Sequence, residues 1–417
     1  MDPFVKAYLE AHSFQELEDE HGVCARWNAT HDKVCLNYDQ ILTKSGDKLA
    51  EQCRGMVVRP TSFTYGDDWK HKTVGNVSVL AWPMNRFYNA GDSAAAEIDW
   101  SDPRLKVYEK LDGTCIILYW DPLHGKWHAG TRGVPEADLP IRGDDLNLGD
   151  TTFSQLFWKA YYQTSIEVAQ RKEFEEQPPQ SLEKFIAYRN MTLDKDITYV
   201  WELTSPHNQI VVYYDKPRVT LLAMRNVKTG VELDVNLHAQ AHMEVPAHWD
   251  IKDEVSLATF VDSADPGKLE GAVVCVPHGP FFARQKVKNK AWVLSSRAKD
   301  TVTASPRSAL ECIILGKIDD VIPLVPKAVG DKLLRMQWAY GQYCKEIDKR
   351  IAEFTLEAAG NRKRYAEQVM LAGDFNAPYF HVWEGKSESA HTWFMTACHA
   401  GKLSAASLDT ILKKLAL

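Results

Sequence analysis

The chain has 417 residues, of which 45% are apolar and 25% are charged, and its formal net charge is −7. This composition is ordinary for a soluble globular protein of two or three domains, and it excludes a chain coated in basic charge. Nucleic acid could then bind only through a local basic cleft, whose field can oppose the net charge.

The first residues, MDPFVKAYLEAHSF, contain no basic segment followed by a long apolar one. We therefore expect no secretory signal, and no window is long and apolar enough to predict a membrane span. The eight cysteines are scattered without a C-x-x-C pair, which predicts reduced thiols in a cytoplasmic protein. A zinc site formed by Cys24, Cys35 and Cys53 is an alternative, but the ligand spacing typical of such sites is missing.

Apolar and charged residues alternate at helical spacing over residues 2–22, and the pattern from Val23 to Arg59 is strand-like. Residues 105–132 predict three short strands, VYEKLDG, TCIILYW and KWHAGTRG, with the turn DPLHGK before the last. A helix is expected over residues 152–176, where Pro178-Pro179 follows and stops it.

Strand patterns return in TYVWELTS, IVVYY, VTLLAMRNV, GAVVCV and FFARQKVKNKAWVL. After about residue 300 they cease, and helical periodicity marks the segments 306–325, 329–358, 361–371 and 389–415. The sequence therefore predicts an α+β body of mostly antiparallel sheets over residues 1–298, followed by an all-helical domain over residues 299–417.

Lys110 opens the motif Lys110-Leu111-Asp112-Gly113 inside the apolar run VYEKLDGTCIILYW. A lysine on a strand beside an acid and a glycine suits covalent nucleotidyl transfer, in which the amine attacks the α-phosphorus of a nucleotide. A free lysine is protonated at neutral pH and cannot attack until burial or neighbouring cations expose its lone pair. Gly113 leaves room for a phosphate or sugar near the backbone. The tetrapeptide alone also arises by accident, so its value depends on what surrounds it.

Other segments supply charged and aromatic residues suited to such a site: Arg54 in CRGM, Arg86 and Tyr88 in PMNRFYN, Arg132 in TRG, Glu202 in WEL, Glu270 in EGAVV, and Lys286 and Lys288 in RQKVK. On a strand, Lys286 and Lys288 point to one face, and burying two ammonium groups without an anion is costly. A triphosphate would supply that anion, and the lysines could stabilise the transferring phosphorus and the departing pyrophosphate.

Glu202 and Glu270 are acids at strand starts, so one could bind a ribose hydroxyl and the other could hold Mg²⁺. Each candidate also has a structural alternative. The cations could face solvent, Glu202 could form a buried salt bridge, and Tyr88 could be a core ring.

In chain order, CRG, PMNRFYN, KLDG, GTRG, WELTSPHNQIVVYY, EGAVV and RQKVKNKAW resemble the ATP-dependent RNA ligases of the phage-type RNA ligase 1 family. These belong to the covalent nucleotidyltransferase superfamily with DNA ligases and capping enzymes, and the resemblance covers about residues 30–320. It implies a nucleotidyltransferase ligase fold of the ATP-grasp-like kind, ATP with Mg²⁺ or Mn²⁺ as cofactors, and RNA with 5′-phosphate and 3′-hydroxyl ends, such as a nicked tRNA, as the partner.

By position, the resemblance implies that Lys110 is the adenylated nucleophile and that Glu202 binds the adenosine ribose. The other implied nucleotide-site residues are Arg54, Arg86, Lys286 and Lys288 at phosphates, Tyr88 near the adenine, and Gly113, Arg132 and Trp292. The implied metal ligands are Glu270 and Asp112. Arg86, Arg132 and Trp292 depart from the usual family residues but keep their charge or aromaticity.

Other functions stay open at this point. A DNA ligase or capping enzyme would share KLDG and the lysine pair, a tRNA-splicing-type ligase module is closer still, and an RNA-binding protein with a decayed active site is the non-enzyme class. The helical domain, with its basic NRKRY and ILKKL stretches, could position RNA or merely cap the catalytic body. A monomer is favoured.

Overall fold

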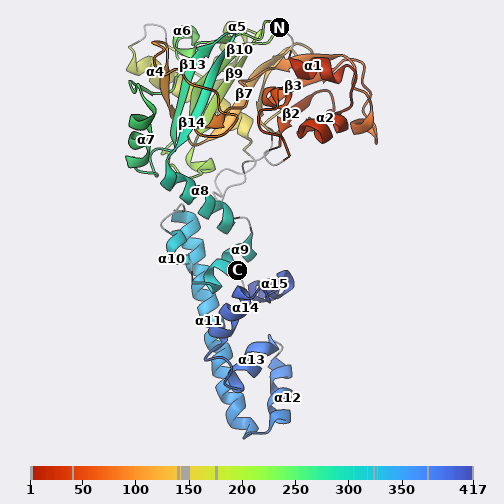
Figure 1. The fold of residues 1–417 in the computed structure, drawn as a ribbon, viewed down its shortest axis with the longest axis vertical. Coiled ribbons are helices and arrows are strands. Elements are labelled where there is room, and N and C mark those ends of the chain that lie inside the picture. Colours follow the sequence, from red (N-terminus) through yellow and green to blue (C-terminus); the bar gives the residue numbers. More distant parts are fainter. Residues whose placement is uncertain are drawn as a thin grey trace. The chain divides into compact units, whose positions relative to one another are not determined.

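The computed structural model describes residues 3–39, 42–138, 141, 151–173, 177–303, 305–316, 318–322, 325, 327–372 and 375–415. The chain forms two compact units, Met1–Trp292 and Val293–Leu417 (Figure 1). The sequence put the boundary after residue 298, whereas the units divide earlier, inside helix α8 (Lys290–Thr303). No helix in the described ranges has the length and apolarity needed to span a bilayer.

Within the described residues, the first unit has three sheets. The first is antiparallel, in the order β1 (Val23–Trp27), β2 (Val34–Tyr38), β3 (Arg54–Pro60) and β4 (Val77–Ala81). The second is antiparallel, in the order β11 (Glu232–Leu233), β10 (Arg218–Asn226), β9 (Ile197–Thr204), β7 (Thr114–Asp121) and β8 (Lys126–Thr131). The third has the order β12 (His248–Trp249), β6 (Lys106–Lys110), β13 (Gly271–His278), β14 (Phe281–Lys288) and β5 (Tyr88–Asn89), with only the β5–β14 pairing parallel among the described strands. The predicted α+β class with mostly antiparallel sheets is confirmed.

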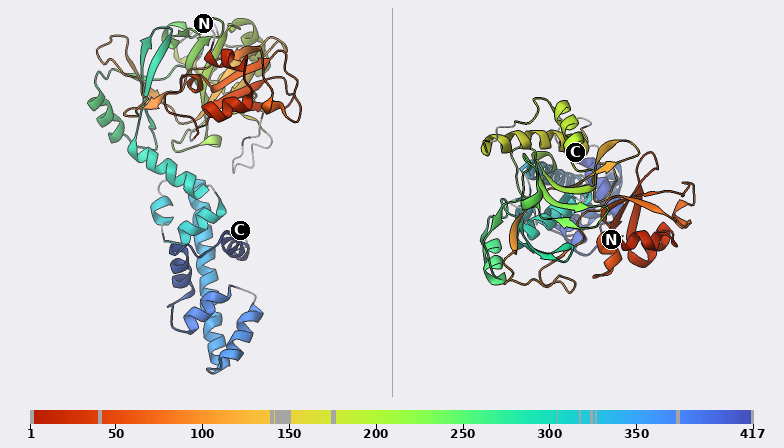
Figure 2. Two further views of the ribbon diagram at one scale, coloured as in Figure 1. Left: turned by 45° about the vertical axis from the view of Figure 1, so that its right-hand side comes forward. Right: turned by 90° about the horizontal axis from the view of Figure 1, so that it is seen from above.

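Helices cover the outer faces of these sheets (Figure 2). They are α1 (Phe4–Leu9), α2 (Phe14–His21), α3 (Lys48–Gln52), α4 (Phe153–Arg171), α5 (Leu182–Thr192), α6 (Val235–His238) and α7 (Glu254–Ser263), with 3₁₀ turns at Trp69–His71 and Pro206–Asn208. The helix expected over 152–176 is α4, which begins at a capping box of Thr152 and Gln155. Residues 174–176 lie outside the described part.

The period-two alternation of the strands separates core from site. On β9, Trp201 and Leu203 pack with α4 and α5, while Val200 belongs to a small cluster on the opposite face. On β6 and β13, Val107, Ala272 and Val274 pack with α7. The remaining faces of the second and third sheets therefore turn toward each other and hold the residues discussed below.

Two strand expectations are corrected. The apolar segment IVVYY, residues 210–214, forms no strand, because the N–H groups of Val211 and Val212 donate to the Asp112 carboxylate instead of to a sheet neighbour, at 2.8 Å each. The run FFARQKVKNKAWVL ends as a strand at Lys288, and the following residues begin helix α8.

The second unit is helical within its described residues, as predicted. Its helices are α9 (Pro306–Ile314), α10 (Ile318–Val321), α11 (Lys327–Ala358), α12 (Arg362–Ala372), α13 (Asn376–Trp383), α14 (Ala390–His399) and α15 (Ala405–Lys414). Helix α11 contributes Tyr340, Ile347 and Ile351 to a core shared with α9 and α12 to α15. The expected helix over 389–415 is two helices, α14 and α15, parted at Gly401, whose φ of +64° ends the first.

A buried ion cluster joins the first sheet to the second. Lys33 Nζ lies 2.7 Å from Asp121 Oδ2 and 2.8 Å from Glu136 Oε1, and the side chains of Lys33 and Asp121 are fully buried. Arg59 also pairs with Asp121, at 2.8 Å. Burial alone would raise the pKa of Asp121, but hydrogen bonds from Arg59 and Lys33 hold it far below its usual range.

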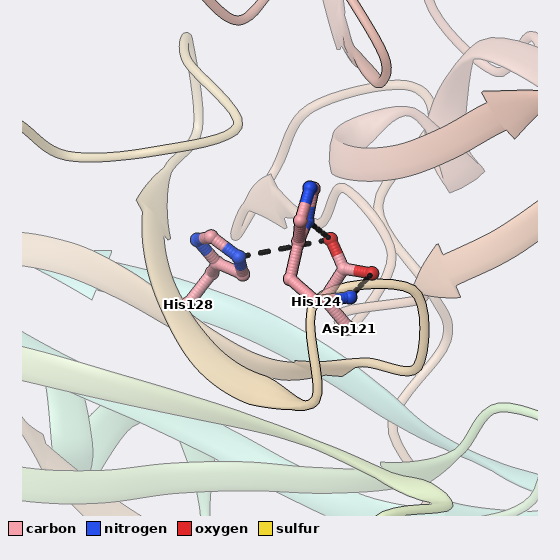
Figure 3. Close-up of side chains that lie close together, drawn as sticks. All are labelled: Asp121, His124 and His128. Atoms are coloured by element: carbon pink, nitrogen blue, oxygen red, sulfur yellow. Dashed lines mark hydrogen bonds and ion pairs between the residues drawn. The ribbon is translucent and has the colours of Figure 1, made fainter. Parts of the chain in front are cut away.

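The same cluster contains Asp121, His124 and His128, whose ligand atoms lie within 4.8 Å of one another (Figure 3). Although this set could hold a metal ion, the Lys33 ammonium already lies 3.2 Å from His128 Nε2 and neutralises Asp121. Burial and the nearby Lys33 charge lower the pKa of His128 to about 4, so its ring is neutral at pH 7. We therefore assign the cluster as an ion-pair network rather than a metal centre.

Substituting Asp121→Asn should lower the free energy of unfolding by about 2–3 kcal/mol, because the buried Lys33 and the partly buried Arg59 lose their shared carboxylate and keep only Glu136 and Asp32. Urea denaturation at pH 7 measures this. Asp68→Asn, which breaks the exposed pair with Lys72, is the matched control and should change stability little. Equal stability of the two variants would contradict the assignment.

Candidate active site

Three strands of the third sheet bring the motif lysine and one of the downstream lysines side by side. Gly271 on β13 pairs with Lys110 on β6 and with Lys288 on β14. Glu270, immediately before Gly271, receives both ammonium groups: Lys110 Nζ lies 2.7 Å from its Oε2 and Lys288 Nζ lies 2.9 Å from its Oε1. Glu270 is almost fully buried, so both oxygens of one carboxylate are engaged in charge-assisted hydrogen bonds.

Two glycines are required by close backbone contacts. A Cβ on Gly271 would lie 2.2 Å from the Val287 carbonyl oxygen, and a Cβ on Gly113 would lie 2.4 Å from that of Leu203. Any other residue would push the neighbouring strand away. Both glycines therefore set the spacing of the backbone around Lys110.

Glu202 faces the site from the second sheet. Its Oε1 accepts a hydrogen bond of 3.1 Å from the Gly113 N–H, next to the motif lysine. Burial raises the pKa of the Glu202 carboxyl to about 7, although the charges of Lys110 and Arg54 oppose the shift. Near pH 7 the Glu202 carboxyl is therefore present in both its protonated and its ionised form.

Cations surround the two acids Glu202 and Glu270. Lys286 Nζ lies 4.9 Å from the centre of the Phe87 ring, and the Arg54 guanidinium lies 5.7 Å from the same ring. Burial, and then the charges of Arg54 and Lys110, lower the pKa of Lys286 to about 7. Arg132 is exposed, and its charge acts in the same direction on Lys286. The cluster is short of anions, which is the property expected of a phosphate-binding site.

Asp112 has a positioning role in the structure. It is buried, and its Oδ2 accepts hydrogen bonds from the N–H groups of Val211 and Val212 and, at 3.1 Å, from Trp292 Nε1. The Trp292 ring in turn lies 4.4 Å from Lys288 Nζ. Asp112 Oδ1 is buried without a hydrogen-bond partner among the described residues. The carboxylate therefore holds a loop and an indole against the lysines.

Arg86 and Tyr88 lie together. The Arg86 guanidinium stands 4.3 Å from the ring centre of Tyr38 and 4.9 Å from that of Tyr88. The Tyr88 hydroxyl accepts a hydrogen bond of 3.0 Å from the Gly46 N–H. Tyr88 thus has Arg86 over its ring, and among the described residues no hydrogen bond or ion pair joins it to Lys110.

An apolar recess lies one residue row beyond the lysines. Tyr108, Val273 and Lys286 pair across the third sheet, next to the row that contains Lys110. A cavity of about 60 Å³ opens there, lined by Met84, Phe87, Tyr108, Glu109, Leu222, Val235, Pro246, Val273, Cys275 and Arg284. Its walls are mostly apolar, and its Phe87 ring is the one that Lys286 and Arg54 contact.

Phe87 and Tyr108 were not among the site residues predicted from the sequence. Tyr108 could have been predicted from the sequence, because it lies two residues before Lys110 and residues two apart on a strand share a face. Phe87 could not be placed in this way, because only the fold brings two cations to its ring.

Carboxylates that could hold a divalent cation are present. Glu202 and Glu270 lie close enough for the charge of Glu270 to raise the pKa of Glu202. Oxygen donors of this kind fit Mg²⁺ or Mn²⁺ with bound water. A cation would compete with Lys110 and Lys288 for Glu270, so metal binding and release of the lysine are linked.

A polyphosphate bound to the cations should raise the lowered pKa of Lys286 toward its ordinary value. Lys286 is largely neutral above pH 7 in the free protein, so binding of inorganic pyrophosphate at pH 8 should take up close to one proton, about 0.5–1. Calorimetry in buffers of different ionisation enthalpy measures the uptake. The uptake should fall sharply in Lys286→Met, where Glu202 remains as a second group that can gain a proton, and it should persist in the control Lys290→Met, an exposed lysine. Binding without proton uptake in the parent chain would refute the assignment.

No family model matches the chain. It is 32% identical over 322 residues to a candidate bifunctional polynucleotide kinase/RNA ligase of Autographa californica nuclear polyhedrosis virus, covering 75% of this chain and 40% of that protein. It is 27% identical over 381 residues to an RNA ligase of Rhodothermus phage RM378, covering 76% of this chain and 78% of the phage protein.

Among solved structures, an archaeal ATP-dependent RNA ligase matches over 86% of this chain and 79% of its own, with 14% identity and a TM-score of 0.37. The two sequence matches fit the phage-type RNA ligase family. The chain spans less than half the length of the baculovirus protein.

Proposed function

We propose that this chain, whose relatives fit the phage-type RNA ligase family, is an ATP-dependent RNA ligase that joins 5′-phosphate and 3′-hydroxyl RNA ends through a lysyl-AMP. The observation that carries the proposal is Lys110 held against Glu270 within a cluster of cations. The two relatives with RNA ligase in their names support RNA as the substrate.

In the first step, Lys110 Nζ attacks the α-phosphorus of ATP, a P–N bond forms, and pyrophosphate leaves. The ammonium must first lose a proton, and Glu270 Oε2, 2.7 Å away, is placed to accept it. Lys286, Lys288 and Arg54 would stabilise the transferring phosphoryl group and the leaving pyrophosphate. A bound Mg²⁺ would neutralise further phosphate charge.

In the second step, the 5′-phosphate of RNA attacks the same phosphorus and Lys110 leaves, giving a 5′–5′ pyrophosphate. In the third step, the RNA 3′-hydroxyl attacks the 5′-phosphate and AMP leaves. We propose that the recess beside Tyr108 and Phe87 receives the adenine. Glu202, beside the Gly113 N–H, would accept a hydrogen bond from a ribose hydroxyl.

The proposed role of the remaining sequence candidates is indirect or peripheral. Asp112 Oδ2 and Trp292 would position the lysines rather than contact the nucleotide. The proposed metal ligands are Asp112 Oδ1, which has no partner among the described residues, and Glu270 once Lys110 has left it. Arg86 and Arg132 would contact phosphates of ATP or of the RNA end. The biological substrate we propose is a broken RNA such as a nicked tRNA, repaired in the cytoplasm, where the free cysteines of the described chain would stay reduced.

A second candidate is a tRNA-splicing-type ligase module, which would use the same lysine but require a 2′-phosphate at the junction.

Separate incubation with α-labelled ATP, α-labelled GTP and adenylate-labelled NAD, each with Mg²⁺, should label the protein from ATP alone. Sealing of RNA ends that lack a 2′-phosphate separates the two ligases, and label from GTP would point to a capping enzyme.

Lys110→Ala should lose label transfer from ATP completely yet still seal RNA that already carries a 5′-adenylate, because the third step needs no lysyl-AMP. Lys106→Ala, on the same strand, is the control and should retain both reactions. The readouts are adenylate mass on the protein and the ligated product on a gel. A folded Lys110→Ala variant that adenylates normally would sink the proposal.

A further inference from the structure

The second unit exposes a large aromatic side chain on its longest helix. Trp338 is 69% exposed, and Leu334, one turn earlier on α11, is 46% exposed. The opposite side of α11, with Tyr340, Ile347 and Ile351, is buried against α9 and α12 to α15. Figure 1 shows α12, α13 and α14 along one side of α11. Within the described residues Trp338 has no ring contact or hydrogen bond, so its exposure has no structural explanation there.

The residues around Trp338 leave an open surface beside the indole. At helical spacing, Gly341 and Lys345 share its face. A Cβ built on Gly341 would meet nothing within 4 Å. Glycine destabilises a helix interior relative to alanine, so its presence at a site with ample space suggests that a flat group approaches the backbone.

The charge of this face favours an anionic partner. Arg335 and Lys345 are exposed. Asp331, seven residues before Trp338 on the same face, is partly buried, and further along the helix Glu346 pairs with Arg350 at 3.1 Å and Glu353 with Lys349 at 3.8 Å. Over the second unit, Lys and Arg number 17 and Asp and Glu number 14, while the whole chain has 49 and 56. The helical unit therefore has the opposite charge balance to the rest of the chain.

We propose that this face, formed by Leu334, Arg335, Trp338, Gly341 and Lys345, binds an unpaired nucleotide of single-stranded RNA. The base stacks on the Trp338 indole above Gly341, and the adjoining phosphates lie against Arg335 and Lys345. The inference deepens the proposed function, because it rests on RNA being the substrate. Stacking tolerates every base, so this contact selects an unpaired strand rather than a sequence.

A second copy of the chain is a weaker occupant. Two exposed apolar side chains offer much less than the roughly 800 Å² per partner that a stable interface buries. The flanking Arg335 and Lys345 would also repel their counterparts across a twofold axis.

The test is binding of a fluorescein-labelled single-stranded RNA to the full chain. Trp338→Ala should weaken binding about tenfold, and Trp338→Phe should restore most of it, since stacking needs only an aromatic face. Lys345→Met should reduce the slope of log K against log salt by about 0.7. The matched control is Leu371→Ala, an exposed apolar residue of α12 (87% exposed), which should bind RNA as the parent does.

Lys110 adenylylation, measured on the same samples, requires no RNA. If the parent chain never forms lysyl-AMP but loses RNA affinity on Trp338→Ala, the proposed function fails and this inference stands. Equal RNA affinity for parent and Trp338→Ala, with both folded by circular dichroism, overturns the inference. So does a dimer in light scattering that dissociates on the same substitution, because the face would then contact a second copy.

Discussion

The site depends on one carboxylate that holds two lysines. Glu270 receives Lys110 from β6 and Lys288 from β14, and it does so almost entirely out of water. Arg54 and Lys286 add two further cations, and the Phe87 ring contacts both. The buried Glu270, the Phe87 ring and Glu202, whose own pKa burial raises to about 7, do not balance this charge. Burial first, and then the neighbouring cations, lower the pKa of Lys286. The site thus contains more positive than negative charge, and a nucleotide triphosphate would supply the missing negative charge.

Strand periodicity explains how a short sequence motif becomes this geometry. Odd and even positions on β6, β13 and β14 separate the α7-facing core from the charged row, so Val107 and Ala272 are buried while Lys110 and Lys288 meet Glu270. Only three residues separate β6 from β7, yet these strands belong to different sheets. The Leu111-Asp112-Gly113 segment connects the two sheets. Asp112 fixes the neighbouring loop by hydrogen bonds, and Gly113 fits against the Leu203 carbonyl because it has no side chain.

Much of this could be predicted from the sequence, because alternation and turn residues are local signals. The α+β body, the helical second unit and the shared face of Lys286 and Lys288 all follow from periodicity. Sheet membership does not, because it depends on contacts between distant segments. The segment 210–214 shows the limit: its β-branched and aromatic residues indicate a strand, but the Asp112 carboxylate takes its N–H groups. The part played by Phe87 was equally out of reach, since nothing local links it to Arg54.

The sealed cluster of Lys33, Asp121 and Glu136 has an evolutionary consequence. The fully buried Lys33 ammonium is balanced by Asp121 and Glu136, which lie 88 and 103 residues further along the chain, and Asp121 is also paired with Arg59. A lineage that loses any one of them would first pass through a poorly folded intermediate. The three positions should accordingly covary among relatives, being kept as a group or replaced as a group by apolar residues.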